Sequence, residues 1–224
     1  MHPLRRLVLR TGVLALGLAC GVSLAAPAPP TESQLTSFFR AVQMDDARTV
    51  KSMLGMTVNA NQLNPIGGEP GLVQALREDA MNVVKVFLEH RGTDLETKAA
   101  NGNTALMMAA FKRNRPAVDA LLARGAAVDQ PGWTALHYAA ASGDEEIVRL
   151  LLARGAQVDP VSPKASGGYT PMMMAAREGH DGTALVLIAH GADRMRRNTE
   201  GLTAVQLAER AGKPRVAKAL ERAR

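Results

Sequence analysis

The sequence has one cysteine and few aromatic residues. Because Cys20 is the only cysteine in 224 residues, the chain cannot form an internal disulfide or a zinc site with several cysteines. Aromatic residues make up 3% of the chain, and Trp133 is the single tryptophan. Hydrophobic residues nevertheless reach 46%, so the core must be built mainly from alanine, leucine, valine and methionine. This composition suits thin helical layers.

Motifs of catalysis and of nucleic-acid binding are also missing. The sequence has no HExxH metal motif, no nucleophile elbow and no glycine-rich phosphate loop, so no cofactor or metal is expected. The formal net charge is +6, but Arg5, Arg6 and Arg10 lie in a leader and leave 24 of the 27 basic residues against 21 acidic ones. That balance is too mild to indicate nucleic acid as a partner.

A pattern of threonine, alanine and glycine recurs along the chain. Successive steps between the repeating threonines are 30, 36 and 33 residues, and those between the repeating glycines are 33, 30 and 36. The residues concerned are Thr104, Thr134, Thr170 and Thr203, and Gly92, Gly125, Gly155 and Gly191. Compared with a step of 33 residues, both series show that three residues are missing before Trp133 and that three are added before Tyr169. We therefore expect helices in register and connecting segments that absorb the difference.

The stretch GWTALHYAAASGDEEIVRLLLARGAQVD at 132–159 resembles an ankyrin repeat. The resemblance covers about 66–224, with a weaker unit at 33–56 as an N-terminal cap. The unit at 67–94 departs most, because it lacks a threonine at the expected helix start. The resemblance implies an all-α ankyrin-repeat solenoid of stacked helix-turn-helix units with short β-hairpin-like turns. We expect about six units over 32–224.

Individual residues explain the pattern physically. Thr134 stands where a helix should begin, and its hydroxyl can accept an unpaired backbone N–H of the first turn. Small Ala139 and Ala140 allow close approach of neighbouring helices. Gly125, Gly155 and Gly191 follow the last helical turn, where a left-handed conformation ends the helix at no steric cost to glycine.

His137 and the acids after it have the residue types of a catalytic site. The equivalent positions are Met107, Met173 and Gln206, and no other histidine shares a motif with His137. In ankyrin repeats this histidine typically forms hydrogen bonds that tie neighbouring turns together, so we expect a structural role. Asp144, Glu145 and Glu146 open a helix, where negative charge is favoured by the helix dipole.

Residues 1–25 have the layout of a secretory signal peptide. A basic start precedes a short apolar segment and small residues at Ser23 and Ala25, which predicts cleavage after Ala25 and a Pro-rich linker at 26–31. Two alternatives remain open. The residues before Cys20 resemble a loose lipoprotein signal, which would anchor the chain to the envelope, and Arg5 with Arg6 partly resembles a twin-arginine signal.

The resemblance further implies that protein partners bind the concave face, formed by the turn tips and the first helix of each unit. Trp133 and Tyr169 occupy the same place in adjacent turns, and aromatic and arginine side chains often anchor interfaces. Alternatively, both rings merely cover the hairpin backbone. The candidate partner-binding residues on that face are Asn101, Asn103, Phe111, Lys112, Trp133, Tyr169, Arg177, Glu178 and Arg210.

Three function classes follow from these observations. The sequence favours a monomeric, non-enzymatic protein-protein interaction module that is periplasmic in the bacterial cell envelope and binds or regulates a protein partner. An inhibitor or immunity partner of a secreted toxin is the alternative. A catalyst would require converging ionisable groups in a cleft, which the sequence does not show.

Overall fold

A computed structural model describes residues 29–223 of the protein. In this part of the chain, twelve α-helices form six pairs, no strand is present, and one short 3₁₀ helix, η1 (Lys164–Ser166), lies in a loop. The first helices of the pairs are α1 (Glu32–Gln43), α3 (Gly71–Arg77), α5 (Ala105–Phe111), α7 (Ala135–Ser142), α9 (Pro171–Glu178) and α11 (Ala204–Arg210). The second helices are α2 (Ala47–Met53), α4 (Met81–Glu89), α6 (Arg115–Ala123), α8 (Glu145–Ala153), α10 (Asp181–Ala189) and α12 (Pro214–Arg222).

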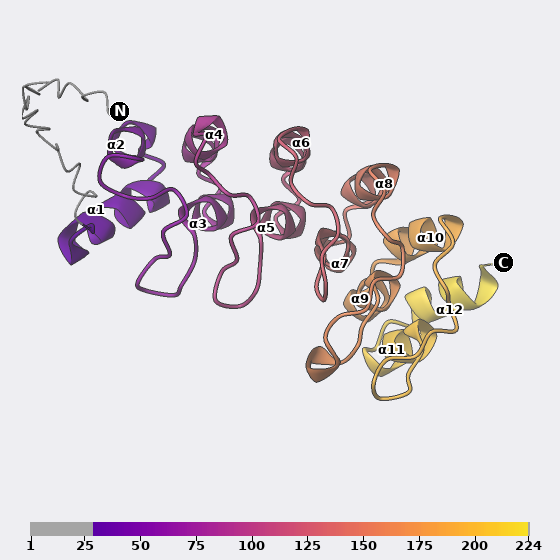
Figure 1. Ribbon diagram of the computed structural model, residues 1–224. Coiled ribbons are helices and arrows are strands. Elements are labelled where there is room, and N and C mark those ends of the chain that lie inside the picture. Colours follow the sequence, from indigo (N-terminus) through magenta and orange to yellow (C-terminus); the bar gives the residue numbers. More distant parts are fainter. Residues whose placement is uncertain (1–28, 224) are drawn as a thin grey trace, which may run out of the picture.

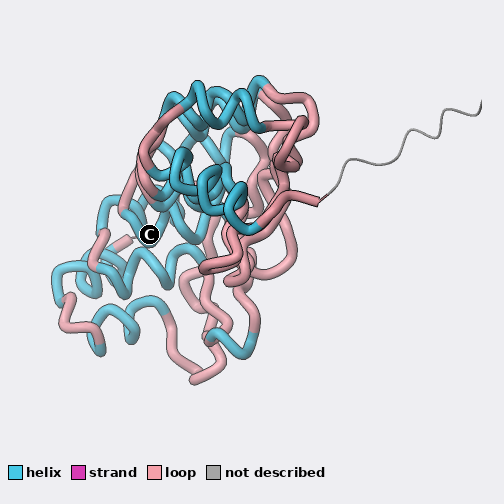
Figure 2. Tube along the Cα trace, turned by 90° about the vertical axis from the view of Figure 1, so that its left-hand side faces the viewer, coloured by secondary structure: helices cyan, strands magenta, loops and turns pink. Residues whose placement is uncertain are grey.

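The helix pairs stack side by side into a curved solenoid. The first helices form one row and the second helices form another, with the long connecting loops extending from the first row (Figure 1). These loops gather along one side of the stacked helices (Figure 2). The all-α ankyrin-like solenoid expected from the repeat spacing is confirmed.

Threonine and glycine bound most of the helices as the sequence predicts. At Thr134, however, the His137 N–H donates to the backbone O at 3.1 Å, and the hydroxyl lies 3.0 Å from His137 Nδ1. The hydroxyls of Thr104, Thr170 and Thr203 accept the backbone N–H three residues on, at 3.5, 3.3 and 3.4 Å, and so pair donors that the first helical turn leaves free. At the other end, Gly125, Gly155 and Gly191 all adopt φ of +90°, a left-handed conformation that ends α6, α8 and α10. Local chemistry thus sets the ends of these helices.

The connecting loops absorb the unequal repeat spacing, as predicted. The loop before α7 runs only from 124 to 134, whereas the loop before α9 runs from 154 to 170 and contains η1. Hairpin-like hydrogen bonds close these loops, for example from Ser162 N to Tyr169 O at 2.9 Å. Thr199 N also donates to Gly167 O at 3.0 Å, which links adjacent loops.

The first two units deviate from the pattern and still form helix pairs. Residues 33–56, expected as the cap, fold into α1 and α2. In the unit without a threonine, Pro70 precedes α3 and no side chain caps the helix. A side chain at Gly71 would meet Phe87, because an added Cβ would lie 2.5 Å from Phe87 Cζ. Glycine there allows α3 to pack against the large ring.

The leader predicted at 1–25 and half of the predicted linker, residues 26–28, lie outside the described residues. Within 29–223, no helix combines the length and the apolar character that crossing a membrane requires.

Candidate protein-binding face

A hollow of about 340 Å³ opens among the first helices of three consecutive units, α5, α7 and α9. This volume lies at the lower end of the range for ligand pockets. We call it the Trp133 hollow. Its lining residues are Phe111, Trp133, His137, Tyr138, Ala141, Met174, Arg177 and Glu178.

The Trp133 hollow exists because a small residue stands between two large ones. Phe111, Ala141 and Arg177 each follow the threonine before their helix by seven residues, so they occupy equivalent places in α5, α7 and α9. A phenyl ring and a guanidinium therefore flank a methyl group. Helix stacking brings the three together, and the missing volume at Ala141 leaves the floor of the hollow open.

Aromatic rings form one wall of the hollow. Tyr138 packs edge-to-face against Phe111 and Trp133, with ring centroids 6.0 and 6.1 Å apart. The Phe111 residue is 51% exposed although its ring is large. Burial raises the pKa of Tyr138, while a hydrogen bond to Asn103 lowers it. The Tyr138 hydroxyl donates this bond to Asn103 Oδ1, which fixes the ring in place.

An arginine and a carboxylate form the opposite wall. The Arg177 guanidinium carbon lies 5.1 Å from the centroid of the Tyr169 ring, a cation-π arrangement. Its Nε and Nη2 donate to Glu178 Oε1 at 3.0 and 2.9 Å. The Arg177 side chain remains 38% exposed. Stacking and pairing hold the charge at the rim of the hollow without removing it from water.

His137 lies behind Trp133 and is fully buried. Its Nδ1 is 3.2 Å from the backbone N of Thr134, which donates to it, and 3.0 Å from the Thr134 hydroxyl. Its Nε2 is 3.0 Å from Tyr169 O, so the geometry fits a neutral ring that donates from Nε2. Burial lowers the pKa of His137 to about 4, against smaller opposing effects from the carbonyls of Tyr169 and Pro160. The predicted structural role, bracing the turn beside Thr134, is confirmed.

Two of the nine candidate residues are not on the surface where the sequence placed them. Asn103 is 8% exposed and accepts the Tyr138 bond, and Tyr169 is 9% exposed. The Tyr169 backbone N donates to Ser162 Oγ at 2.9 Å, and Gly167 of the same long loop lies against the Tyr169 ring. Both side chains support the hollow from within and offer little area to a partner.

Four of the nine candidates, Phe111, Trp133, Arg177 and Glu178, meet at the Trp133 hollow. Their role in partner binding stays a prediction. The Trp133 ring also packs against the buried His137 ring, with centroids 5.1 Å apart. The alternative that both aromatic rings merely cover the hairpin backbone is likewise still a prediction.

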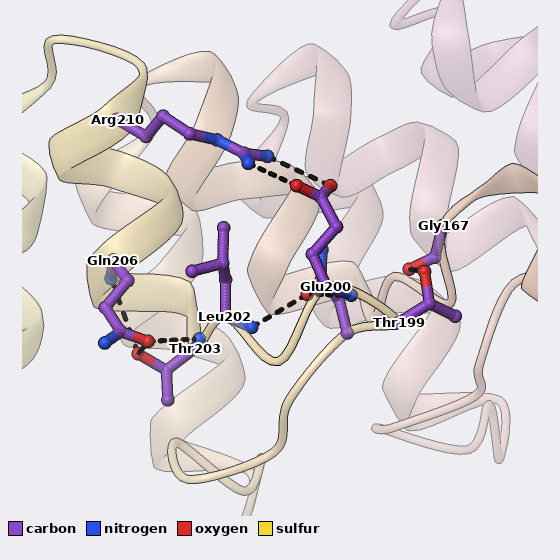
Figure 3. Close-up of polar contacts among 8 residues, drawn as sticks. Gly167, Thr199, Glu200, Leu202, Thr203, Gln206 and Arg210 are labelled. Carbon is purple, nitrogen blue, oxygen red and sulfur yellow. Dashed lines mark hydrogen bonds and ion pairs between the residues drawn. The ribbon is translucent and has the colours of Figure 1, made fainter.

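The three remaining candidates lie away from the hollow. Asn101 is exposed in the loop before α5, and the Lys112 ammonium lies 2.7 Å from Asp79 Oδ2. Arg210 in α11 forms a two-pronged ion pair with Glu200, which Figure 3 shows, and Nη2 lies 3.1 Å from Glu200 Oε1. The hydrogen bond from Arg210 is the main cause of the lowered pKa of Glu200.

Sequence reasoning missed Tyr138, Ala141 and Met174 as lining residues. A signal for them existed: Tyr138 and Met174 each follow their threonine by four residues, one turn before the position of Ala141 and Arg177. Positions four and seven residues after the threonine therefore face the hollow together.

A family profile described as Ankyrin repeats (3 copies) matches this chain at residues 38–131, 72–162 and 117–198. The chain belongs to the ankyrin-repeat family. Ankyrin repeats are protein-protein interaction modules, and the first helices that form the Trp133 hollow belong to the repeats matched here.

Two human proteins are similar to this ankyrin-repeat chain. SH3 and multiple ankyrin repeat domains protein 2 from Homo sapiens is 31% identical over 179 residues, which is 79% of this chain and 10% of that protein. Transient receptor potential cation channel subfamily A member 1 from Homo sapiens is 34% identical over 88 residues, 38% of this chain and 8% of that protein. The chain spans no more than a tenth of the length of either relative.

Within the described residues, no three or more histidine, cysteine, aspartate or glutamate side chains are grouped so as to hold a metal ion. Four ionisable side chains line the hollow, namely His137, which is buried, and Tyr138, Arg177 and Glu178.

Proposed function

We propose that this ankyrin-repeat chain is a non-enzymatic module that binds one protein partner in the bacterial cell envelope through the Trp133 hollow. The observation that carries the proposal is the convergence of Phe111, Trp133 and Arg177 from three consecutive units on one opening. Aromatic and arginine side chains contribute most to protein interfaces when they cluster in such a recess.

The geometry favours binding over chemistry. His137, the one histidine on the lining, is buried with both ring nitrogens occupied by Thr134 and Tyr169. Arg177 and Glu178 form an ion pair with each other at the rim. Such a surface can recognise a shape and a charge, and it presents no group poised to transfer a proton.

The site of action in the envelope rests on the sequence of the leader. Its basic start, short apolar segment and small residues at Ser23 and Ala25 support export and a mature chain that begins at Ala26. Lipidation at Cys20 is the alternative, and it would leave the module attached to a membrane surface. Mass spectrometry of the protein purified from envelope fractions distinguishes these outcomes.

Affinity capture tests the binding proposal. The parent chain and Trp133→Ala are immobilised separately and exposed to envelope extract, and bound proteins are quantified by mass spectrometry. We expect one protein to be enriched by the parent and depleted by the variant, whose helical circular dichroism must match the parent's. Equal recovery of every protein by the two would contradict the proposal.

A further inference from the structure

We infer that the occupant of the Trp133 hollow is an acidic peptide segment of the partner that inserts one bulky apolar side chain. The inference rests on the proposed function and specifies the chemistry of its partner. It follows from the shape of the hollow, the charges at its edges and the state of Arg177.

The shape of the hollow calls for a single large apolar group. Phe111, Trp133 and Tyr138 line one wall and Met174 lies on the opposite helix, so apolar atoms dominate the interior. Ala141 provides the floor. An aromatic or leucine side chain inserted above Ala141 would restore the packing that a larger residue there would give.

The charges around the hollow favour an acidic neighbour of that side chain. Arg113 follows Phe111 by two residues at one edge, and its side chain is 63% exposed, with its Nε 3.6 Å from Asp144. At the other edge the Lys213 side chain lies against Gly179, next to Glu178. Cations therefore stand at both ends, whereas Glu178 is the one carboxylate on the lining.

Arg177 can bind a second carboxylate in addition to Glu178. Its Nε and Nη2 are bound to the same oxygen of Glu178, and Nη1 has no hydrogen-bond partner among the described residues. Tyr169 supports one face of the guanidinium, so little side-chain freedom is lost on binding. Glu178 competes with an incoming carboxylate for this arginine. The remaining Nη1 donor of Arg177 thus attracts an acid, and competition from Glu178 limits the affinity.

A phage-displayed library of random peptides tests the inference, with the full chain as bait. We expect enriched peptides to combine one aromatic or leucine residue with nearby aspartate or glutamate. The most enriched peptide is then synthesised, and its dissociation constant is measured by fluorescence anisotropy for the parent and for variants. Arg177→Gln should weaken binding about tenfold, since a charge-assisted contact is lost. Glu178→Gln should strengthen binding, and Lys218→Gln on the exposed face of α12 should leave it unchanged.

The outcomes separate this inference from the proposed function. If selected peptides lack acids, or if Arg177→Gln binds as the parent does, the acidic occupant is refuted. Should such peptides still lose affinity with Trp133→Ala, the hollow remains a binding site of other chemistry. Peptides that are insensitive to Trp133→Ala would refute the hollow itself, and a library that yields no enriched sequence would refute a peptide occupant.

Discussion

Acid should destabilise this protein through His137. Burial lowers the pKa of the folded-state imidazole from 6.5 to about 4, and no neighbouring carboxylate compensates a charge there. Protonation would also turn Nδ1 into a donor that faces the Thr134 N–H, 3.2 Å away. The buried ring is therefore stable only when neutral.

The sign and size of the effect follow from linkage. Because the folded-state pKa lies below the unfolded value, the unfolded chain binds the extra proton between pH 6.5 and 4. The stability associated with neutral His137 is complete above pH 6.5 and is lost as the pH falls toward 4. A difference of 2.5 units, from 6.5 to 4, corresponds to about 3 kcal/mol, of which about 2 kcal/mol is already lost near pH 5.

A matched variant isolates this contribution from all other titrations. Gln206 is equivalent to His137, and its Oε1 accepts the Thr203 N–H at 2.9 Å, so His137→Gln should preserve the turn without titrating. Free energies of unfolding are measured in urea by circular dichroism at about pH 7.5 and about pH 5. The parent should lose about 2 kcal/mol more than His137→Gln. Equal losses would refute the reasoning.

Further outcomes follow from the helix ends and the leader. Arg124 donates to the carbonyls of Phe87 and His90 at 2.9 and 2.8 Å, so Arg124→Ala should lower the free energy of unfolding in urea by about 1–2 kcal/mol. Arg154 is exposed, and Arg154→Ala should lower it little. Arg113 has φ of +57° where the next three units have glycine, so Arg113→Gly should raise the melting temperature, with a gain of up to about 1 kcal/mol. The protein purified from envelope fractions should have the intact mass of a chain that begins at Ala26. The mass of a chain that begins at Met1 would contradict export processing.

The helices could be predicted from the sequence because their limits depend on local chemistry. Thr104, Thr170 and Thr203 form hydrogen bonds within one turn, and glycines such as Gly155 end helices through their own backbone conformation. The repeat spacing then fixed the stacking order. Long-range packing was needed only to place neighbouring units against one another.

The site was harder to predict because it depends on lateral packing. Ala141 reads as one more small core residue, and only its two neighbours in the stack, Phe111 and Arg177, make it the floor of a hollow. Tyr169 reads as the equivalent of Trp133, but the inserted residues of its loop cover it, whereas the loop before Trp133 is short. The sizes of the neighbouring side chains thus decide where the hollow opens, and the length of the preceding loop decides which aromatic ring stays accessible.

The dissociation constant of the captured partner for an Ala141→Phe variant tests the central claim most directly. The added phenyl ring should fill the hollow while the wall residues stay in place, and Ala153→Phe on the exposed end of α8 is the matched control. Isothermal titration calorimetry should show at least about tenfold weaker binding for Ala141→Phe and parent-like binding for Ala153→Phe. Parent-like binding by Ala141→Phe, with its fold intact by circular dichroism, would contradict partner binding in the Trp133 hollow.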